Sequence, residues 1–147
     1  MKEHYLKLGI SLTVSLVLMF VLTMSMIDTV DHFHLNLSNA DMALIMVAPM
    51  GIVMLVVMWD MFKDRQLNYL LLGAFAVLFV AGLWLGRSSA LVGDEQFLRS
   101  MIPHHSRAIL VCQESDITDP EIIELCDEII QTQREEIRQM EGILARY

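Results

Sequence analysis

Basic residues are scarce in this sequence of 147 residues, which has 10 lysines and arginines against 18 aspartates and glutamates. Nearly all of the net charge of −8 lies after residue 93, where twelve acids accompany five bases. Because an acidic surface repels nucleic acid, DNA and RNA are excluded as partners. Most of these carboxylates are expected to form a solvated helix face.

Charge is also missing from three long apolar runs in the first part of the chain. The runs cover about residues 8–27, 42–60 and 67–86, and each has the length of a helix that crosses a lipid bilayer. The first run is longer than a signal peptide core, and no cleavage pattern follows it, so we expect it to be retained. The sequence therefore predicts an all-α protein with a three-span membrane anchor over residues 1–87 and a two-helix hairpin over residues 88–147.

The loop between the first two runs contains no lysine or arginine, whereas Lys2, Lys7, Lys63 and Arg65 belong to the opposite side. Short loops rich in basic residues stay in the cytoplasm, so we expect a cytoplasmic N-terminus and an outward-facing hairpin. In a bacterium this means the inner membrane, with the hairpin in the periplasm. No ionisable residue inside the runs marks an ion path or a transported substrate.

A cluster of possible metal ligands, Met101, His104 and His105, lies in the first helix of the predicted hairpin. On a helix Met101 is a neighbour of both residues, so its sulfur can share an ion with either imidazole. The adjacent rings diverge by about 100° and are poorly placed to bind one ion together. Thioether sulfur selects Cu(I), which makes copper the first choice of metal and zinc the second. A packed histidine beside a solvated one is an equally weighted alternative.

The expected hairpin register adds two further ligands. Folding the chain about residues 114–118 places residues 101–105 opposite about 128–132, with Gln133 one step away. A glutamine in an apolar seam needs a partner, so Gln133 either fixes the register or supports the metal. Met140 is expected below Met101, nearer the membrane.

Two residue pairs carry weaker signals. The outward loop carries His32 and His34, which are expected to approach the same site. In the predicted register Cys112 and Cys126 are offset by about five residues along the helix axes, which is far for a disulfide. An oxidising compartment nevertheless permits one. A disulfide and free thiols therefore stay equally open.

The hairpin has two helix seams that need covering. The second helix carries an uninterrupted seam at alternating steps of three and four: Ile123, Cys126, Ile130, Gln133, Ile137, Met140 and Leu144. The first helix offers two adjacent seams, one containing His104 and the other His105. A hairpin of this size cannot bury a stable core alone, so a second copy is expected to complete a four-helix bundle, as a homodimer.

A methionine repeat occupies the second apolar run at steps of four residues: Met42, Met46, Met50, Met54 and Met58. Such a repeat drifts about 40° per step around an α-helix. Methionine is a common packing residue between spans, so packing is the favoured interpretation. A metal path stays open for Met42 and Met46 at the outward end.

Three blocks, F-x-x-x-M-I-P-H-H-x-x-A-I, T-D-P-E-I-x-x-L-C-x-x-I-I and Q-x-E-E-I-x-x-M, resemble the domain of unknown function 305 family over about residues 97–140. The resemblance implies a ferritin-like helical bundle, commonly periplasmic, with copper-binding relatives rich in methionine and histidine. It carries over to five positions: Met101, His104, His105, Gln133 and Met140. Val111 and Arg107 depart from the family pattern and should weaken cation binding.

The leading functional hypothesis is a membrane-anchored protein that buffers copper or hands it to a partner protein without catalysis. The alternative is a structural or assembly subunit of a membrane complex, with no bound metal. An enzyme with a di-metal centre is disfavoured, because the Glu-x-x-His helix pairs of di-iron bundles are missing.

Overall fold

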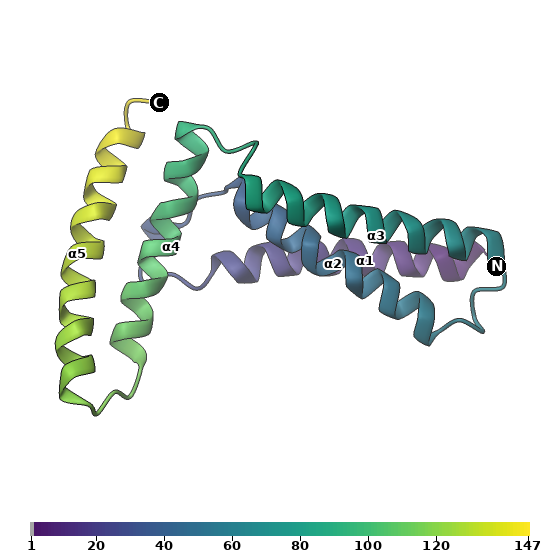
Figure 1. Cartoon of the computed structure of the whole chain (residues 1–147), viewed down its shortest axis with the longest axis horizontal. Coiled ribbons are helices and arrows are strands. Elements are labelled where there is room, and N and C mark those ends of the chain that lie inside the picture. Colours follow the sequence, from purple (N-terminus) through teal and green to yellow (C-terminus); the bar gives the residue numbers. More distant parts are fainter. Residues whose placement is uncertain (1) are drawn as a thin grey trace. The chain divides into compact units, whose positions relative to one another are not determined.

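The computed structural model describes residues 2–147, which form five α-helices and one short 3-10 helix but no strand (Figure 1). The elements are α1 (Lys2–Met24), η1 (Val30–His32), α2 (Leu37–Val57), α3 (Arg65–Ser88), α4 (Asp94–Glu114) and α5 (Pro120–Leu144). The predicted all-α class, with three long apolar helices followed by two further helices, is confirmed. The chain forms two compact units.

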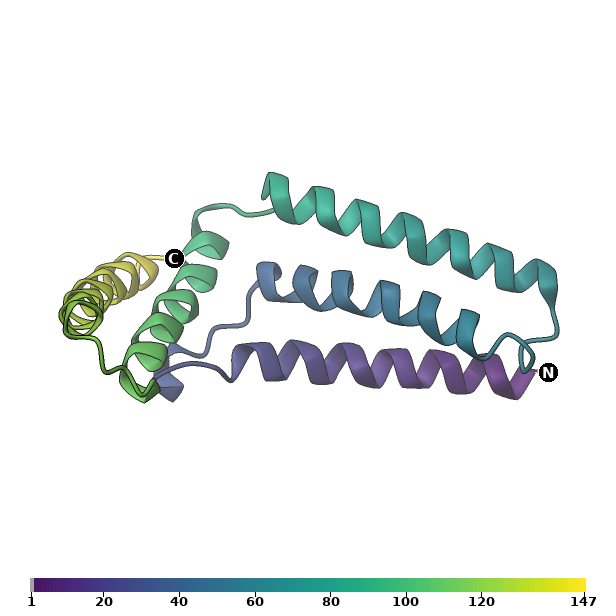
Figure 2. The ribbon, with the colours of Figure 1, turned by 60° about the horizontal axis from the view of Figure 1, so that its bottom comes forward.

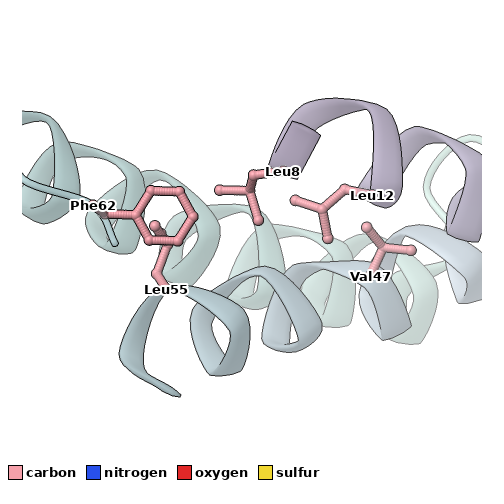
Figure 3. Close-up of a cluster of buried hydrophobic side chains, with 5 residues drawn as sticks. All are labelled: Leu8, Leu12, Val47, Leu55 and Phe62. Carbon is pink, nitrogen blue, oxygen red and sulfur yellow. The ribbon is translucent and has the colours of Figure 1, made fainter. Parts of the chain in front are cut away.

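The first unit combines the chain up to Val21 with Ser38–Leu91, so it contains nearly all of α1, α2 and α3. These helices lie side by side in both views (Figures 1 and 2). Each is long and apolar enough to cross a membrane, by length and composition. Their buried cluster is made by α1, α2 and the loop that follows α2 (Figure 3): Leu8, Leu12, Val47, Leu55 and Phe62.

Small and polar residues bring the three helices close together. A Cβ atom added at Gly51 of α2 would lie 2.8 Å from the ring of Phe75 of α3, so only glycine allows this approach without a shift. Asn68 of α3 is fully buried, and its side chain accepts from the Tyr5 hydroxyl at 2.7 Å and donates to the Phe62 carbonyl at 2.7 Å. Buried polar groups need such partners, so Asn68 ties α1 and the α2–α3 loop to α3.

The second unit combines the connecting segment (Leu22–Leu37) with Val92–Tyr147. Helices α4 and α5 form an antiparallel hairpin (Figures 1 and 2) around the hairpin cluster: Leu98, Ile102, Ile109, Ile137 and Met140. Helix α5 begins at the helix-start pattern Asp119-Pro120-Glu121, with Pro120 in its first position and the Asp119 side chain accepting from the Glu121 N–H at 2.9 Å. Gly93 is the N-cap of α4, and Asp94 lies in its first turn.

The buried face of α4 lies beyond the predicted seam that contains His105, on the side away from the seam that contains His104. Its buried residues are Leu98, Ile102, Pro103, Ser106 and Ile109, of which only Leu98 belongs to a predicted seam. Phe97 and Val111, which belong to the seam of His104, are exposed. This shift has a physical cause: α4 is covered by α5 and also by the connecting segment, which contacts it through η1. A helix with two neighbours buries the residues between the two contact faces.

The predicted hairpin register is wrong. Cys112 of α4 and Cys126 of α5 form a disulfide with Cα atoms 5.4 Å apart, which shifts the pairing of the two helices by about five residues from the predicted register, and His105 contacts Glu136, outside residues 128–132. Residues 115–119 are not helical, so the turn itself lies only one residue later than expected, and the register is set by how the two helices pack. The disulfide that the sequence left open is therefore present.

Candidate functional site

His105 has a fixed orientation on α4. Its Nδ1 atom lies 2.8 Å from the Met101 carbonyl oxygen, and its Nε2 atom lies 2.9 Å from Oε2 of Glu136 on α5. A carbonyl oxygen only accepts, so Nδ1 carries a hydrogen and donates it. Nε2 bonds to Glu136 when it also carries a hydrogen, and it otherwise presents a lone pair. A histidine whose Nδ1–H is held by a carbonyl is the arrangement that orients metal-binding imidazoles.

His104 points elsewhere. It is exposed, and its ring stands edge-on to that of His105, with centroids 5.8 Å apart and an interplanar angle of 65°. The two adjacent imidazoles thus diverge, as their spacing on a helix predicts. Only His105 contacts α5, so His104 is an edge residue of the site.

Two methionines belong to the same part of the hairpin. Met140 of α5 is 9% exposed and belongs to the hairpin cluster, against which Met101 packs. The expectation that Met140 lies below Met101, nearer the membrane, stays a prediction. Gln133 is half-buried on α5, one helical turn before Glu136.

His32 of η1 contacts α4 through Ser106. Its Nδ1 atom lies 2.8 Å from Ser106 Oγ and 3.1 Å from Thr29 Oγ1, while Nε2 lies 3.9 Å from Oε1 of Glu141. Ser106 is fully buried, and its Oγ accepts from the Asp28 N–H at 2.8 Å. The set resembles a Ser-His-acid triad, but a substrate cannot reach a buried oxygen that is already bonded. The network instead fastens the connecting segment to α4.

His34 has a buried ring nitrogen. Nε2 of this residue is inaccessible to solvent and has no hydrogen-bond partner in the described structure. Burial lowers the pKa of His34 below its ordinary value, and the charges of Arg99 and His32 lower it further against the opposing effect of Glu141. The neutral imidazole is therefore favoured, and this is the form that binds metal ions.

Acidification is expected to destabilise the second unit through His34. Because its pKa is lowered in the folded state, the unfolded chain takes up the proton first as the pH falls below about 6.5. Stability should therefore be greatest above that pH and fall as the pH drops toward the folded pKa. Amide hydrogen exchange of α4 between pH 8 and pH 5 measures this loss.

Replacing His34→Gln should reduce this pH dependence, whereas replacing the exposed His104→Gln should leave it unchanged. An equal pH dependence in the parent and in the His34→Gln variant would contradict the role of His34.

The predicted ligands fall into two groups. Met101, His105 and Met140 gather along the hairpin, whereas His32 and His34 belong to the connecting segment, where His32 is bonded to Ser106. Within residues 2–147, no three His, Cys, Asp or Glu side chains are arranged to hold one metal ion.

Sequence reasoning missed three partners of the two bonded histidines, Ser106, Glu136 and Glu141, and it also missed Asp28, whose N–H donates to Ser106. For Ser106 a signal existed, because it continues the buried series Leu98, Ile102 and Ile109 at helical spacing. The two glutamates carried no signal, since their roles follow from the register in which α4 and α5 pack.

The arrangement defines an all-α protein in which three helices suited to a membrane precede a disulfide-closed hairpin. Residues 85–144 match the sequence model of a family described as "Domain of unknown function (DUF305)", so this hairpin belongs to that family and the resemblance is confirmed. The chain is also similar to "Uncharacterized protein L153" of Acanthamoeba polyphaga mimivirus, at 29% identity over 119 residues, which cover 80% of this chain and 76% of the viral protein. No solved structure matches.

Proposed function

We propose that this chain is a membrane-anchored metal-binding protein whose hairpin holds copper, as Cu(I), and buffers it or hands it on without catalysis. The observation that carries the proposal is the geometry of His105. Its Nδ1–H is held by the carbonyl of Met101, one turn earlier, so Nε2 is directed toward α5. An imidazole nitrogen beside thioethers is a ligand set that favours Cu(I), with zinc as the second choice.

Binding would exchange one partner of His105 for another. On loading, Nε2 would lose its hydrogen and its bond to Glu136 and would bind the ion, with Met101 and Met140 as sulfur ligands. His104 at the edge, and Gln133 one turn from Glu136, would be secondary ligands or supports. His32 and His34 would join only after His32 leaves Ser106, so we place them outside the first set.

The disulfide supports the predicted location. Disulfides persist in oxidising compartments, so the pairing of Cys112 with Cys126 favours an outward-facing hairpin. With three helices suited to a bilayer, this supports an inner-membrane protein with a cytoplasmic N-terminus and a periplasmic hairpin. Exposed apolar residues near the closed end of the hairpin, Val111, Ile122 and Leu125, are consistent with a homodimer.

Metal content of the detergent-purified protein tests the proposal. The protein is exposed separately to Cu(I), Cu(II) and Zn(II), exchanged into metal-free buffer and assayed by elemental analysis. We expect the parent protein to retain copper after Cu(I) loading. The copper that the hairpin binds should be lost in the His104→Ala/His105→Ala variant. Replacing His4→Ala in α1 is the matched control and should leave copper retention unchanged.

A second pair of variants examines the sulfur ligands. Met101→Leu and Met140→Leu nearly conserve volume and remove one thioether each, so each should lower Cu(I) affinity without unfolding the hairpin. If the double alanine variant retains as much copper as the parent, the hairpin site is refuted.

One observation favours the alternative of a structural or assembly subunit. Both ring nitrogens of His105 already face hydrogen-bond acceptors, Met101 O and Glu136, so the residue joins α4 to α5 without needing a metal ion. In that case the parent would retain no metal. Glu136→Gln would loosen the hairpin, and adding copper would not change the stability of the hairpin in either protein.

A further inference from the structure

The methionine repeat of α2 is not explained by the hairpin site. Met42, Met46, Met50 and Met54 stand in α2, and Met58 follows its last residue, with its N–H donating to the Met54 carbonyl at 3.1 Å. A seam that packs on one neighbour alternates steps of three and four, as the seam of α5 does. A constant step of four drifts about 40° each time, so five residues sweep about 160° around the helix.

Burial along α2 follows this drift. Met50, Met54 and Met58 are half-buried and pack against the cluster of the first unit. Met42 and Met46 are 52% and 43% exposed, so they have little packing role within the unit. Packing therefore accounts for three methionines of the repeat and leaves the spacing of the other two without a reason.

The relation between consecutive methionines is what stays constant. Residues four apart are neighbours on a helix surface, so the two side chains of every consecutive pair start from neighbouring positions with the same spacing. Methionine side chains are flexible, which lets both sulfurs of a pair turn toward one ion. Thioether sulfur is a soft ligand that selects Cu(I) and binds Zn(II) weakly. The spacing thus suits bidentate binding of a soft cation.

We propose that α2 is a second metal site, a ladder of two-sulfur sites for Cu(I) formed by Met42, Met46, Met50, Met54 and Met58. Met19 of α1 packs against the same cluster as Met50 and Met54 and adds a thioether from a second helix. Five sulfurs form at most two separate pairs, so the ladder holds up to two Cu(I) ions. It goes beyond the hairpin site and does not require that site to bind.

The experiment uses the full chain in detergent with His104→Ala/His105→Ala as the background, which removes both histidines of the proposed hairpin site. Cu(I) is titrated without oxygen against a coloured copper chelator, and Ag(I) serves as a second soft probe. We expect at least one Cu(I) per chain in this background and no Zn(II). Replacing all five ladder methionines with leucine should abolish that binding, since leucine conserves volume but has no sulfur.

A register-shifted variant is the matched control. Leu44→Met/Met46→Leu with Ile52→Met/Met54→Leu keeps five methionines between residues 42 and 58 but spaces them at steps of two and six, so that no two are helix neighbours. The proposal requires the loss of Cu(I) binding here too. Copper retained as in the background protein, or no copper in the background protein itself, would overturn it. Failure of the hairpin site alone appears instead as equal copper content with and without the two histidines.

Discussion

Replacing Ile102→Ala is expected to destabilise the hairpin by about 2–5 kcal/mol. Ile102 is fully buried between Leu98 and Ile109 on α4 and packs in the hairpin cluster with Ile137 and Met140. The truncation removes methyl groups that touch both helices, and the close-packed surroundings leave a cavity. This position also lies in the turn that carries Met101 and His105, so the loss should loosen the ligand set as well.

Amide hydrogen exchange of α4 and α5 measures this effect better than a global unfolding curve, because a chain with two compact units need not unfold in one step. A loss of 2 kcal/mol corresponds to exchange roughly 30-fold faster. Gln139→Ala is the control, since Gln139 is exposed on α5 and its truncation should change stability by less than about 0.5 kcal/mol. Equal exchange in the two variants would contradict the buried role of Ile102.

The parts of the fold that sequence predicted correctly are those set by local patterns. The three apolar runs give three helices, and Asp119-Pro120-Glu121 starts α5, because hydrophobicity and capping act over a few residues. The helix boundaries differ from the predicted ones where tertiary context sets them. Helix α1 extends from Lys2 to Met24, although its charge-free run begins at Leu8 and continues to Ile27. Helical geometry tolerates polar residues before an apolar run.

The residues of the candidate site could be predicted from the sequence, but the contacts between them could not. Met101 and His105 share a helical turn in any register, so their proximity needed no tertiary information. The position of Met140 and the partner Glu136 depend on where the chain reverses, and an error of a few residues in the turn moves every contact across the hairpin. The role of Ser106 depends on the connecting segment, whose packing on α4 has no local sequence pattern.

Breaking the disulfide is expected to cost the hairpin about 3 kcal/mol, the value for a closed loop of roughly 15 residues. Cys112 and Cys126 are 14 residues apart and join α4 to α5 near the turn. The double variant Cys112→Ala/Cys126→Ala should therefore show faster amide exchange in α4 and α5, and a reductant should accelerate exchange in the parent to the same degree. In the double variant the reductant should have no effect, which separates the disulfide from other actions of the reagent.

The same pair of thiols tests the orientation of the chain. If the hairpin occupies an oxidising compartment, a thiol reagent added to intact cells or spheroplasts should label neither cysteine until a reductant has been added. A hairpin in the cytoplasm would be reduced and would react without that step once the reagent crosses the membrane. Labelling without reductant would overturn the outward orientation. It would also mean that Met101, His105 and Met140 are held together without a covalent bond between α4 and α5. Protection before reduction, joined to the loss of about 3 kcal/mol after it, would instead make the disulfide the element that keeps the two halves of the proposed copper site in register.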